Sequence, residues 1–284
     1  MHWIDMSTIS RQDEGTGAQP TSAFPQEMDK ADFSDSYHEL SLSYNGGKDC
    51  LVLLILYLAA VGQHIWQIRL LGELDGSNET FVTNSCHGHE VTTKHGIRKI
   101  AGPPPPESLA SVYIAAPSAF PQLTGFVETS ASKYHLQLAS YATKPQPPNA
   151  LSFRQAFVHY LQDRPQTKAI LVGTRRTDPN GANLGFFDRT DGKWREEGAD
   201  FMRVHPVIEW EYDDVWRFLR LVKEVSPEFG WCELYDRGYT SLGGKDDTRP
   251  NPQLREEGSG KGAWYRPAWE LQDGTAERAG RNWP

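Results

Sequence analysis

Strand-like segments alternate with helix-length segments over much of the chain, and this alternation limits the fold more than any other feature. Short apolar segments at residues 38–44, 111–116, 136–141 and 169–172 predict strands. Segments with helical apolar spacing lie between and after them, at residues 49–61, 125–135, 151–161 and 212–221. Because strands that alternate with helices form βαβ units, we expect an α/β protein with a parallel sheet.

Two parts of the chain fall outside this alternation. Residues 1–35 are rich in Ser, Gly, Asp, Glu and Pro without periodicity, which predicts a flexible N-terminal arm. Residues 72–108 are polar, end in four prolines and show no persistent helix or strand pattern, so we expect a surface loop insertion there. Because zinc needs four ligands in a tight geometry, the histidines of this insertion favour a surface loop over a metal site: His87, His89 and His95.

Charge and cysteine content exclude several protein classes. The net charge of -8, without any basic block, argues against a nucleic-acid partner. No apolar run reaches about 18–20 residues, so we expect no membrane span, and no secretory signal is visible at the N-terminus. Cys50, Cys86 and Cys232 are an odd set without metal-ligand spacing, which favours a reduced, cytoplasmic location.

The segment Ser43-Tyr44-Asn45-Gly46-Gly47-Lys48-Asp49-Cys50 follows the first predicted strand and begins the first predicted helix. Gly46 and Gly47 can adopt a positive φ and allow a ligand to approach the backbone. The following helix N-terminus presents free N–H groups, a geometry that suits a pyrophosphate. A Gly-Gly pair after a strand is also typical of a simple tight turn, and these residues alone leave both interpretations open.

A second polar turn, Gly173-Thr174-Arg175-Arg176-Thr177-Asp178-Pro179, directly follows the predicted strand at residues 169–172. The guanidinium groups of Arg175 and Arg176 offer planar donor forks to phosphate. The Asp178 carboxylate can accept hydrogen bonds from a base or sugar, or help to hold magnesium. The alternative is a type I turn with exposed arginines. Because ligands bind beyond the carboxyl ends of parallel strands, we expect the two turns to share one site.

These segments carry a resemblance to a known family. Residues 43–50 resemble the PP-loop of the adenine-nucleotide α-hydrolases and the PAPS-reductase family. Within that family, Leu171–Pro179, Asp200–Val207 and Leu234–Gly243 resemble the eukaryotic FAD synthases, the FMN adenylyltransferases of fungi. The tail segments Tyr265–Trp269 and Glu277–Arg281 extend the match, which covers roughly residues 38–71 and 109–281. The chain departs from the family pattern at residues 192–199, which replace a Trp-Pro pair.

The resemblance implies a Rossmann-like, mostly parallel sheet with helices on both faces. It implies an ATP-binding core at residues 36–210 and a C-terminal region, 211–284, that completes the flavin site. The nucleotide-binding residues expected from the two turns are Ser43, Asn45, Gly46, Gly47, Lys48, Gly173, Arg175 and Arg176. The expected catalytic residues are Asp49, Asp178, Asp191, Arg278 and Arg281.

The implied reaction is transfer of AMP from ATP to FMN, which gives FAD and pyrophosphate, with Mg²⁺ held mainly by the ATP phosphates. One alternative is a sulfonucleotide reductase of the same fold, which needs a nucleophilic cysteine in a C-terminal tail, and no Cys follows Cys232. Another is a nucleotide- or flavin-binding protein without turnover. The expected partners are small molecules only, and the oligomeric state is left open.

Three further features have mainly structural interpretations. His205 is expected to be a hydrogen-bonded structural residue, and Cys50 to be buried and not a nucleophile. The aromatic segment Glu233–Tyr239 suits either a wall for the isoalloxazine ring or core packing. The polar segment Gly243–Thr248 suggests a flap near the flavin.

Overall fold

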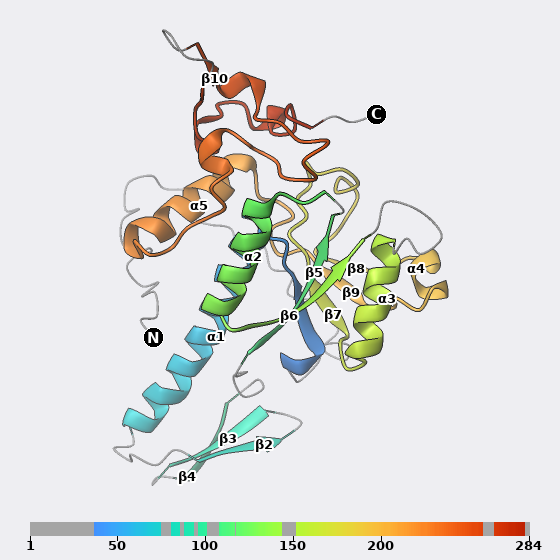
Figure 1. Ribbon diagram of the computed structural model, residues 1–284. Helices are drawn as coiled ribbons and strands as arrows, with labels where there is room; N and C mark the ends of the chain where they lie inside the picture. The colour runs from blue at the N-terminus through green and yellow to red at the C-terminus, as the bar shows by residue number, and fades with distance from the viewer. Residues whose placement is uncertain are drawn as a thin grey trace. The chain divides into compact units, whose positions relative to one another are not determined.

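The computed structural model describes residues 37–74, 81–85, 88–93, 96–100, 108–116, 118–143, 152–257 and 264–281 (Figure 1). Two compact units divide the chain: Met1–Tyr37 with Tyr57–Pro105, and His38–Leu56 with Pro106–Pro284. Every candidate site residue belongs to the second unit. The predicted N-terminal arm, residues 1–35, lies outside the described residues, and the predicted division at residue 210 stays a prediction.

A six-stranded sheet forms the centre of the second unit, with the strand order β6-β5-β1-β7-β9-β8. All neighbouring pairs are parallel except β8 with β9, so the expectation of a mostly parallel α/β sheet is confirmed. The strands are β1 (Leu40–Ser43), β5 (Leu109–Ala115), β6 (Leu136–Ala142), β7 (Ala169–Leu171), β8 (Phe187–Arg189) and β9 (Met202–Val204).

The strand β1 marks the point where the chain changes direction across the sheet. From β1 the chain adds β5 and β6 on one side. It then returns to add β7, β8 and β9 on the other side, where β9 lies between β7 and β8. Leu42 of β1 is in register with Ser111 of β5 and with Leu171 of β7. Open α/β sheets bind ligands at such a reversal, beyond the carboxyl ends of the strands. The loops after β1 and β7 are therefore next to each other at this edge.

The helices are α1 (Lys48–Leu74), α2 (Pro121–Lys133), α3 (Phe153–Asp163), α4 (Gly192–Glu196) and α5 (Tyr212–Val225). Local sequence explains several starts. A proline occupies the first turn of α2, and a capping box of Ser152 and Gln155 begins α3. The helix α5 begins with a second reciprocal pair, between Glu211 and Asp214.

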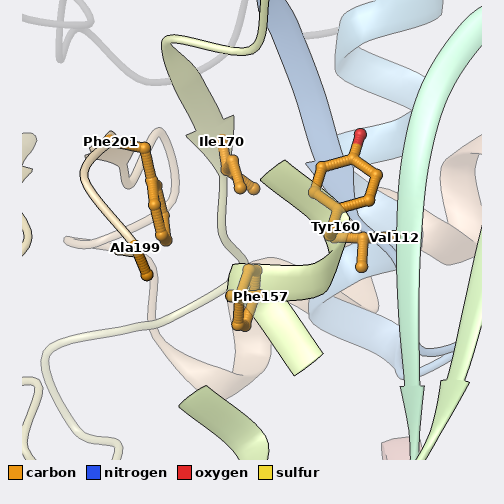
Figure 2. Close-up of a cluster of buried hydrophobic side chains, with 6 residues drawn as sticks. All are labelled: Val112, Phe157, Tyr160, Ile170, Ala199 and Phe201. Carbon is orange, nitrogen blue, oxygen red and sulfur yellow. The ribbon is translucent and has the colours of Figure 1, made fainter. Parts of the chain in front are cut away.

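Helices cover both faces of the sheet. On one face, Phe157 and Tyr160 of α3 pack with Val112, Ile170, Ala199 and Phe201 (Figure 2). The ring of Phe157 stacks on that of Phe201, with 5.4 Å between centroids. Because strand side chains alternate, Tyr113 points to the opposite face, where its hydroxyl bonds with Thr124 of α2. Burial of each large apolar side chain stabilises this core by about 1.5–3 kcal/mol.

The helix α1 begins one residue before its predicted start and continues well beyond the predicted end at residue 61. Leu51, Val52, Leu53 and Leu54 are all essentially inaccessible to solvent. A helix that is apolar on all sides is a buried one, so the first turns of α1 are fixed within the second unit.

The prediction that residues 72–108 form a loop without regular structure is wrong, because this segment contains three strands. Phe81–Ser85 (β2), Gly88–Thr93 (β3) and Gly96–Ile100 (β4) form an antiparallel three-stranded sheet in the first unit. These strands hold most of the β-branched residues of the segment, and Ser85 pairs with Gly88 and Thr93 with Gly96, a register typical of hairpins. His89 lies in β3, whereas Cys86, His87 and His95 lie outside the described residues.

Candidate active site

The loop after β1 packs closely against α2. Gly46 has a φ of 71°, and a Cβ added there would lie 2.7 Å from Cγ2 of Val127. Glycine is therefore required at this position by both conformation and space. The Asn45 side chain accepts a hydrogen bond of 2.9 Å from the Gly47 backbone N–H, which holds the turn in shape. The tight-turn interpretation and the ligand-loop interpretation are thus both compatible with Gly46.

The N-terminus of α1 follows this loop directly. The Lys48 backbone N–H donates to the hydroxyl of Tyr235 at 2.9 Å, so a residue from the C-terminal region supports the first helical turn. The Leu51 N–H bonds to the Gly47 carbonyl. The remaining N–H groups of the first turn have no intrahelical acceptor, and they give this end of the helix a partial positive charge.

The loop after β7 packs directly against the start of α1. A Cβ added to Gly173 would lie 3.0 Å from the Cys50 backbone nitrogen and 3.1 Å from the Asp49 carbonyl carbon. A side chain at position 173 would therefore require the start of α1 to shift by a few tenths of an ångström. The expectation that the two polar turns lie together at one edge of the sheet is confirmed.

Four charged side chains from three distant segments form a closed ring of ion pairs, which we call the ion ring: Lys48, Asp49, Arg175 and Glu277. Lys48 Nζ lies 3.1 Å from Asp49 Oδ2, and Arg175 Nε lies 2.8 Å from Asp49 Oδ1. The Glu277 carboxylate closes the ring, because one oxygen pairs with Lys48 Nζ and the other with Arg175 Nη2. The ring joins the loop after β1, the loop after β7 and the C-terminal segment.

The ion ring is buried, and its neighbouring charges stabilise one another. The side chains of Lys48 and Arg175 are only 2% and 1% exposed. Burial acts to lower the pKa of both cations, but the neighbouring Asp49 and Glu277 carboxylates raise each pKa above its ordinary value. Burial likewise acts to raise the pKa of Asp49, yet Lys48 and Arg175 hold it below its ordinary value. The charges of Lys48, Arg175 and Asp49 are therefore stabilised by their ring neighbours.

Asp178 lies beside the ion ring without belonging to it. Its Oδ2 accepts a 2.9 Å hydrogen bond from the Arg175 N–H, and its Oδ1 lies 4.0 Å from Arg175 Nη2. Burial raises the pKa of this carboxyl; the Arg175 N–H opposes that change, and the nearby Asp49 charge adds to it. A carboxylate in such surroundings gains stability from any cation that comes near. Asp178 therefore remains a candidate for the catalytic centre.

The tail arginines differ in their contacts. Burial and the neighbouring Arg281 lower the pKa of the half-buried Arg278. The carboxylates of Asp178, Glu277 and Asp247 act in the opposite direction, so Arg278 is in electrostatic contact with the ring. Arg281 instead holds the loop before it in the chain: it donates to the Leu242 carbonyl at 2.9 Å and pairs with Asp247 at 3.2 Å.

The contacts of Arg281 also hold the segment Gly243–Thr248, which the sequence suggests as a flap near the flavin. A Cβ added to Gly243 would lie within 2.4 Å of the Arg281 guanidinium, so the backbone of Gly243 packs on that group. The backbones of Thr248 and Arg281 form an isolated antiparallel β-bridge, and the Lys245 N–H donates to the Ser118 carbonyl. The segment is therefore held both to the connection between β5 and α2, which contains Ser118, and to the tail, which contains Arg281.

Arg176 and Asp191, like Arg281, are predicted site residues that form no ion pair with the ion ring. Arg176 pairs with the exposed Glu209 and donates to the carbonyls of Ala182 and Leu184, so its fork is used to shape its own loop. Asp191 is the N-cap of α4, where it accepts from the Trp194 N–H at 3.2 Å.

The position of Asp191 follows from the direction of β8. This strand is antiparallel to β9, with Phe187 opposite Val204 and Arg189 opposite Met202. The chain therefore leaves β8 at the edge of the sheet away from the carboxyl ends of β1 and β7. The role of Asp191 in the site stays a prediction that no contact to the ion ring supports.

Lys48 and Arg175 are both predicted nucleotide-binding residues, and carboxylates of the chain already pair with Lys48 Nζ and with two nitrogens of Arg175. Their roles towards a nucleotide stay predictions. Arg175 Nη1 is buried and has no hydrogen-bond partner among the described residues, so it keeps the capacity to donate to one further acceptor.

The sequence patterns assign no role to Glu277 or Tyr235, although these residues lie in the tail segment Glu277–Arg281 and the aromatic segment Glu233–Tyr239. Glu277 directly precedes Arg278 in the tail motif, and its charge was the available signal. Tyr235 is fully buried and supports the start of α1, so of the two interpretations offered for its segment the structure favours packing. The buried His205 bonds through Nδ1 to the Gly185 carbonyl, and its structural interpretation is confirmed.

The described cysteines are unsuited to nucleophilic catalysis. Burial raises the pKa of the Cys50 thiol from 9.0 to about 12 and raises that of Cys232 as well, so both stay protonated at neutral pH. Both thiols are free. Among the described residues, no group of three His, Cys, Asp or Glu side chains is arranged to hold a metal, and no helix is long and apolar enough to cross a membrane.

Comparison with known proteins agrees with this geometry. Residues 39–250 match the model of the phosphoadenosine phosphosulfate reductase domain. The probable FAD synthase of Schizosaccharomyces pombe is 34% identical over 247 residues, which are 86% of this chain and 71% of that protein. The flavin adenine dinucleotide synthase of Saccharomyces cerevisiae is 32% identical over 233 residues, 82% of this chain and 64% of that protein.

A solved structure shows the same fold. The crystal structure of Candida glabrata FMN adenylyltransferase, in complex with FMN and the ATP analog AMPCPP, is 29% identical to this chain. It superimposes with a TM-score of 0.64 and covers 88% of this chain and 83% of its own. The chain therefore belongs to the phosphoadenosine phosphosulfate reductase domain family and, within it, to the FAD synthases.

Proposed function

We propose that this chain is an FMN adenylyltransferase that uses the carboxyl edge of its sheet to make FAD and pyrophosphate from ATP and FMN. The convergence of the loop after β1, the loop after β7 and the Arg278 tail segment at one ion ring is the observation that carries the proposal. Family membership supports it, since the related Candida glabrata enzyme was crystallised with FMN and an ATP analog.

In this reaction a phosphate oxygen of FMN attacks the α-phosphorus of ATP. A new P–O bond forms, and the bond from the α-phosphorus to the β-phosphate oxygen breaks, so that its electron pair leaves with pyrophosphate. The attacking oxygen is already ionised at neutral pH, so no side chain is needed as a general base. Catalysis then consists of positioning and charge stabilisation.

The chain supplies both the positioning and the charge stabilisation. Gly46, Gly47 and the N-terminus of α1 suit the β- and γ-phosphates, because the glycines present no side chain to a ligand and the helix end carries a partial positive charge. The half-buried Arg278 offsets the repulsion between the FMN phosphate and the ATP phosphates. In this scheme the ion ring fixes the loops, and its charges are already satisfied before a nucleotide enters.

Mg²⁺ fits this site through few protein ligands. The ion pair of Asp178 with Arg175 is long, at 4.0 Å, and the raised pKa of Asp178 marks a position where a cation is favourable. Magnesium is commonly held by one or two carboxylates together with substrate phosphates. When bound, the ion offsets negative charge on the phosphates. Asp178 would be its protein ligand, and Asp49 is already engaged by Lys48 and Arg175.

The proposal includes a cytoplasmic location, which the two free, buried thiols of Cys50 and Cys232 support. A sulfonucleotide reductase is not favoured, because the described thiols are buried and their pKa values are raised.

Incubation of the purified chain with ATP, FMN and Mg²⁺, followed by chromatography, tests the function. We expect FAD and pyrophosphate in equal amounts, and no FAD when EDTA replaces Mg²⁺. A folded preparation that binds ATP and FMN at equilibrium without releasing pyrophosphate would identify a non-catalytic binding protein instead. A preparation that makes FAD equally well in EDTA would remove the magnesium part of the proposal alone.

A further inference from the structure

Glu277 is held in place from both sides of its own backbone. Its carbonyl accepts a 2.5 Å hydrogen bond from the hydroxyl of Thr240, a buried residue. The buried Asn251 donates at 2.8 Å to the carbonyl of Ala276 and at 3.0 Å to the Thr240 hydroxyl. These contacts fix the backbone of the tail at the point where the carboxylate of Glu277 enters the ion ring.

The charges of the ion ring balance only when Glu277 is present. Lys48 and Arg175 contribute two positive charges, and Asp49 and Glu277 contribute two negative charges. Without the Glu277 carboxylate, Lys48 Nζ and Arg175 Nη2 would each lose a partner, and the two buried cations would share the single negative charge of Asp49. The side chains at the start of α1 and in the loop after β7 would then have to move, because buried charges without a partner are strongly unfavourable.

Glu277 also connects the ring to the tail arginine. Arg278 is the next residue, and its guanidinium is in electrostatic contact with Asp178 and Glu277. A displacement of the Glu277 backbone would therefore move Arg278 as well. The Glu277 carboxylate is thus the side chain of the ion ring that joins the tail to both loops, which also contact each other directly through Asp49 and Arg175.

We propose that Glu277 is a positioning residue for the adenylyl-transfer site: its carboxylate holds Lys48 and Arg175 so that Asp49 and Arg278 stay in register with the nucleotide. This inference rests on the proposed function for its kinetic readout. Its consequence is that charge and length at position 277 control ATP binding and turnover, separately from whether the protein folds.

Three variants test this. Glu277→Gln keeps the size of the side chain and removes its charge, whereas Glu277→Asp keeps the charge and shortens the reach. Glu270→Gln is the matched control, because it makes the same change in the same tail, at an exposed carboxylate that pairs with Arg266 at 3.6 Å outside the ring. For each, kcat and KM for ATP are measured well below the thermal midpoint, together with ATP binding by calorimetry.

We expect Glu277→Gln to lower kcat/KM for ATP about 100-fold, the scale of a displaced catalytic constellation. Glu277→Asp should recover part of that loss, and Glu270→Gln should match the unaltered protein. A folded Glu277→Gln variant whose kinetics equal those of Glu270→Gln would overturn the proposal. If Glu277→Gln does not fold, Glu277→Asp decides: a folded variant with unaltered kcat/KM would show that position 277 does not set the geometry.

The failure of the proposed function would be recognised separately. If the unaltered protein forms no FAD, kcat and KM cannot be compared among the variants. ATP binding measured by calorimetry then tests the role of Glu277 by itself. Weaker ATP binding in Glu277→Gln than in Glu270→Gln would then support the positioning role, and equal binding would refute it.

Discussion

Arg175 and Arg176 are neighbours in the chain and have opposite environments. Arg175 is 1% exposed and pairs with Asp49 and Glu277 within the ion ring. Arg176 is 39% exposed and pairs with the still more accessible Glu209 on the surface. The loop after β7 thus directs one guanidinium into the protein and the other to solvent, and the two residues have different physical roles.

The difference teaches what each kind of ion pair contributes. A buried pair has lost its hydration, so removal of one partner leaves an uncompensated charge. An exposed pair is surrounded by water and screened by salt, so its loss changes little. The following variants test this contrast, from the largest expected effect to the smallest.

Removal of the buried arginine should have the largest effect. Arg175→Ala leaves Asp49 and Glu277 with only Lys48, and we expect a loss of about 3–5 kcal/mol in the free energy of unfolding. Urea denaturation followed by fluorescence measures it, with Arg176→Ala as the matched control one residue away. Equal denaturation midpoints for the two variants would show that burial of the ring does not stabilise the fold.

The tail arginine should affect turnover more than stability. Arg278→Ala should lose about 2–4 kcal/mol of transition-state stabilisation, the scale of preorganised electrostatic groups. The measurement is kcat/KM for FMN, beside a thermal melt without ligand. Arg237→Ala is the control, because it removes an exposed arginine that pairs with Glu233 at 3.0 Å. If kcat/KM for FMN does not change, Arg278 does not act on the transferring phosphates.

Cys50 tests whether a buried residue next to the ring has a chemical role. Cys50→Ser should keep turnover within about tenfold, a barrier change near 1.4 kcal/mol. The thiol, with its pKa of about 12, should resist iodoacetamide at pH 8 until the protein unfolds. A thousandfold loss of turnover with intact ATP binding would instead make Cys50 a catalytic group.

The same thiol predicts a direction for stability against pH. Its pKa is 9.0 ordinarily and about 12 in the fold, so between these values the unfolded chain releases the proton and the folded chain keeps it. Stability contributed at this site therefore falls as pH rises above 9. In Cys50→Ser this part of the decline should disappear from denaturation curves measured across that range.

The exposed arginine should have the smallest effect. Arg176→Ala should leave kcat/KM for ATP unchanged, and any change in thermal midpoint should diminish as salt is added, because the pair with Glu209 is screened. Melts at low and high salt measure this. A clear fall in kcat/KM for ATP would restore the role that the sequence suggested, in which Arg176 contacts a phosphate.

The sequence determined the α/β class, the turn after β1 and the turn after β7, because each depends on local patterns. Alternating segments predict βαβ units, and in a parallel sheet the strand ends that carry Gly46 and Gly173 must share an edge. The sequence did not predict the strands β2–β4. They are short and polar on much of their length, so in a one-dimensional pattern they resemble a loop.

Only the tertiary structure decided how the charged residues are used. Glu277 lies 229 positions from Lys48 and 102 from Arg175, and their contacts exist because the tail folds back on the loops. The outward turn of Arg176 and the distant edge reached by Asp191 likewise depend on chain direction, which composition does not encode. An ion pair is a matter of distance in space, and a local sequence pattern carries no information on distances between segments so far apart in the chain.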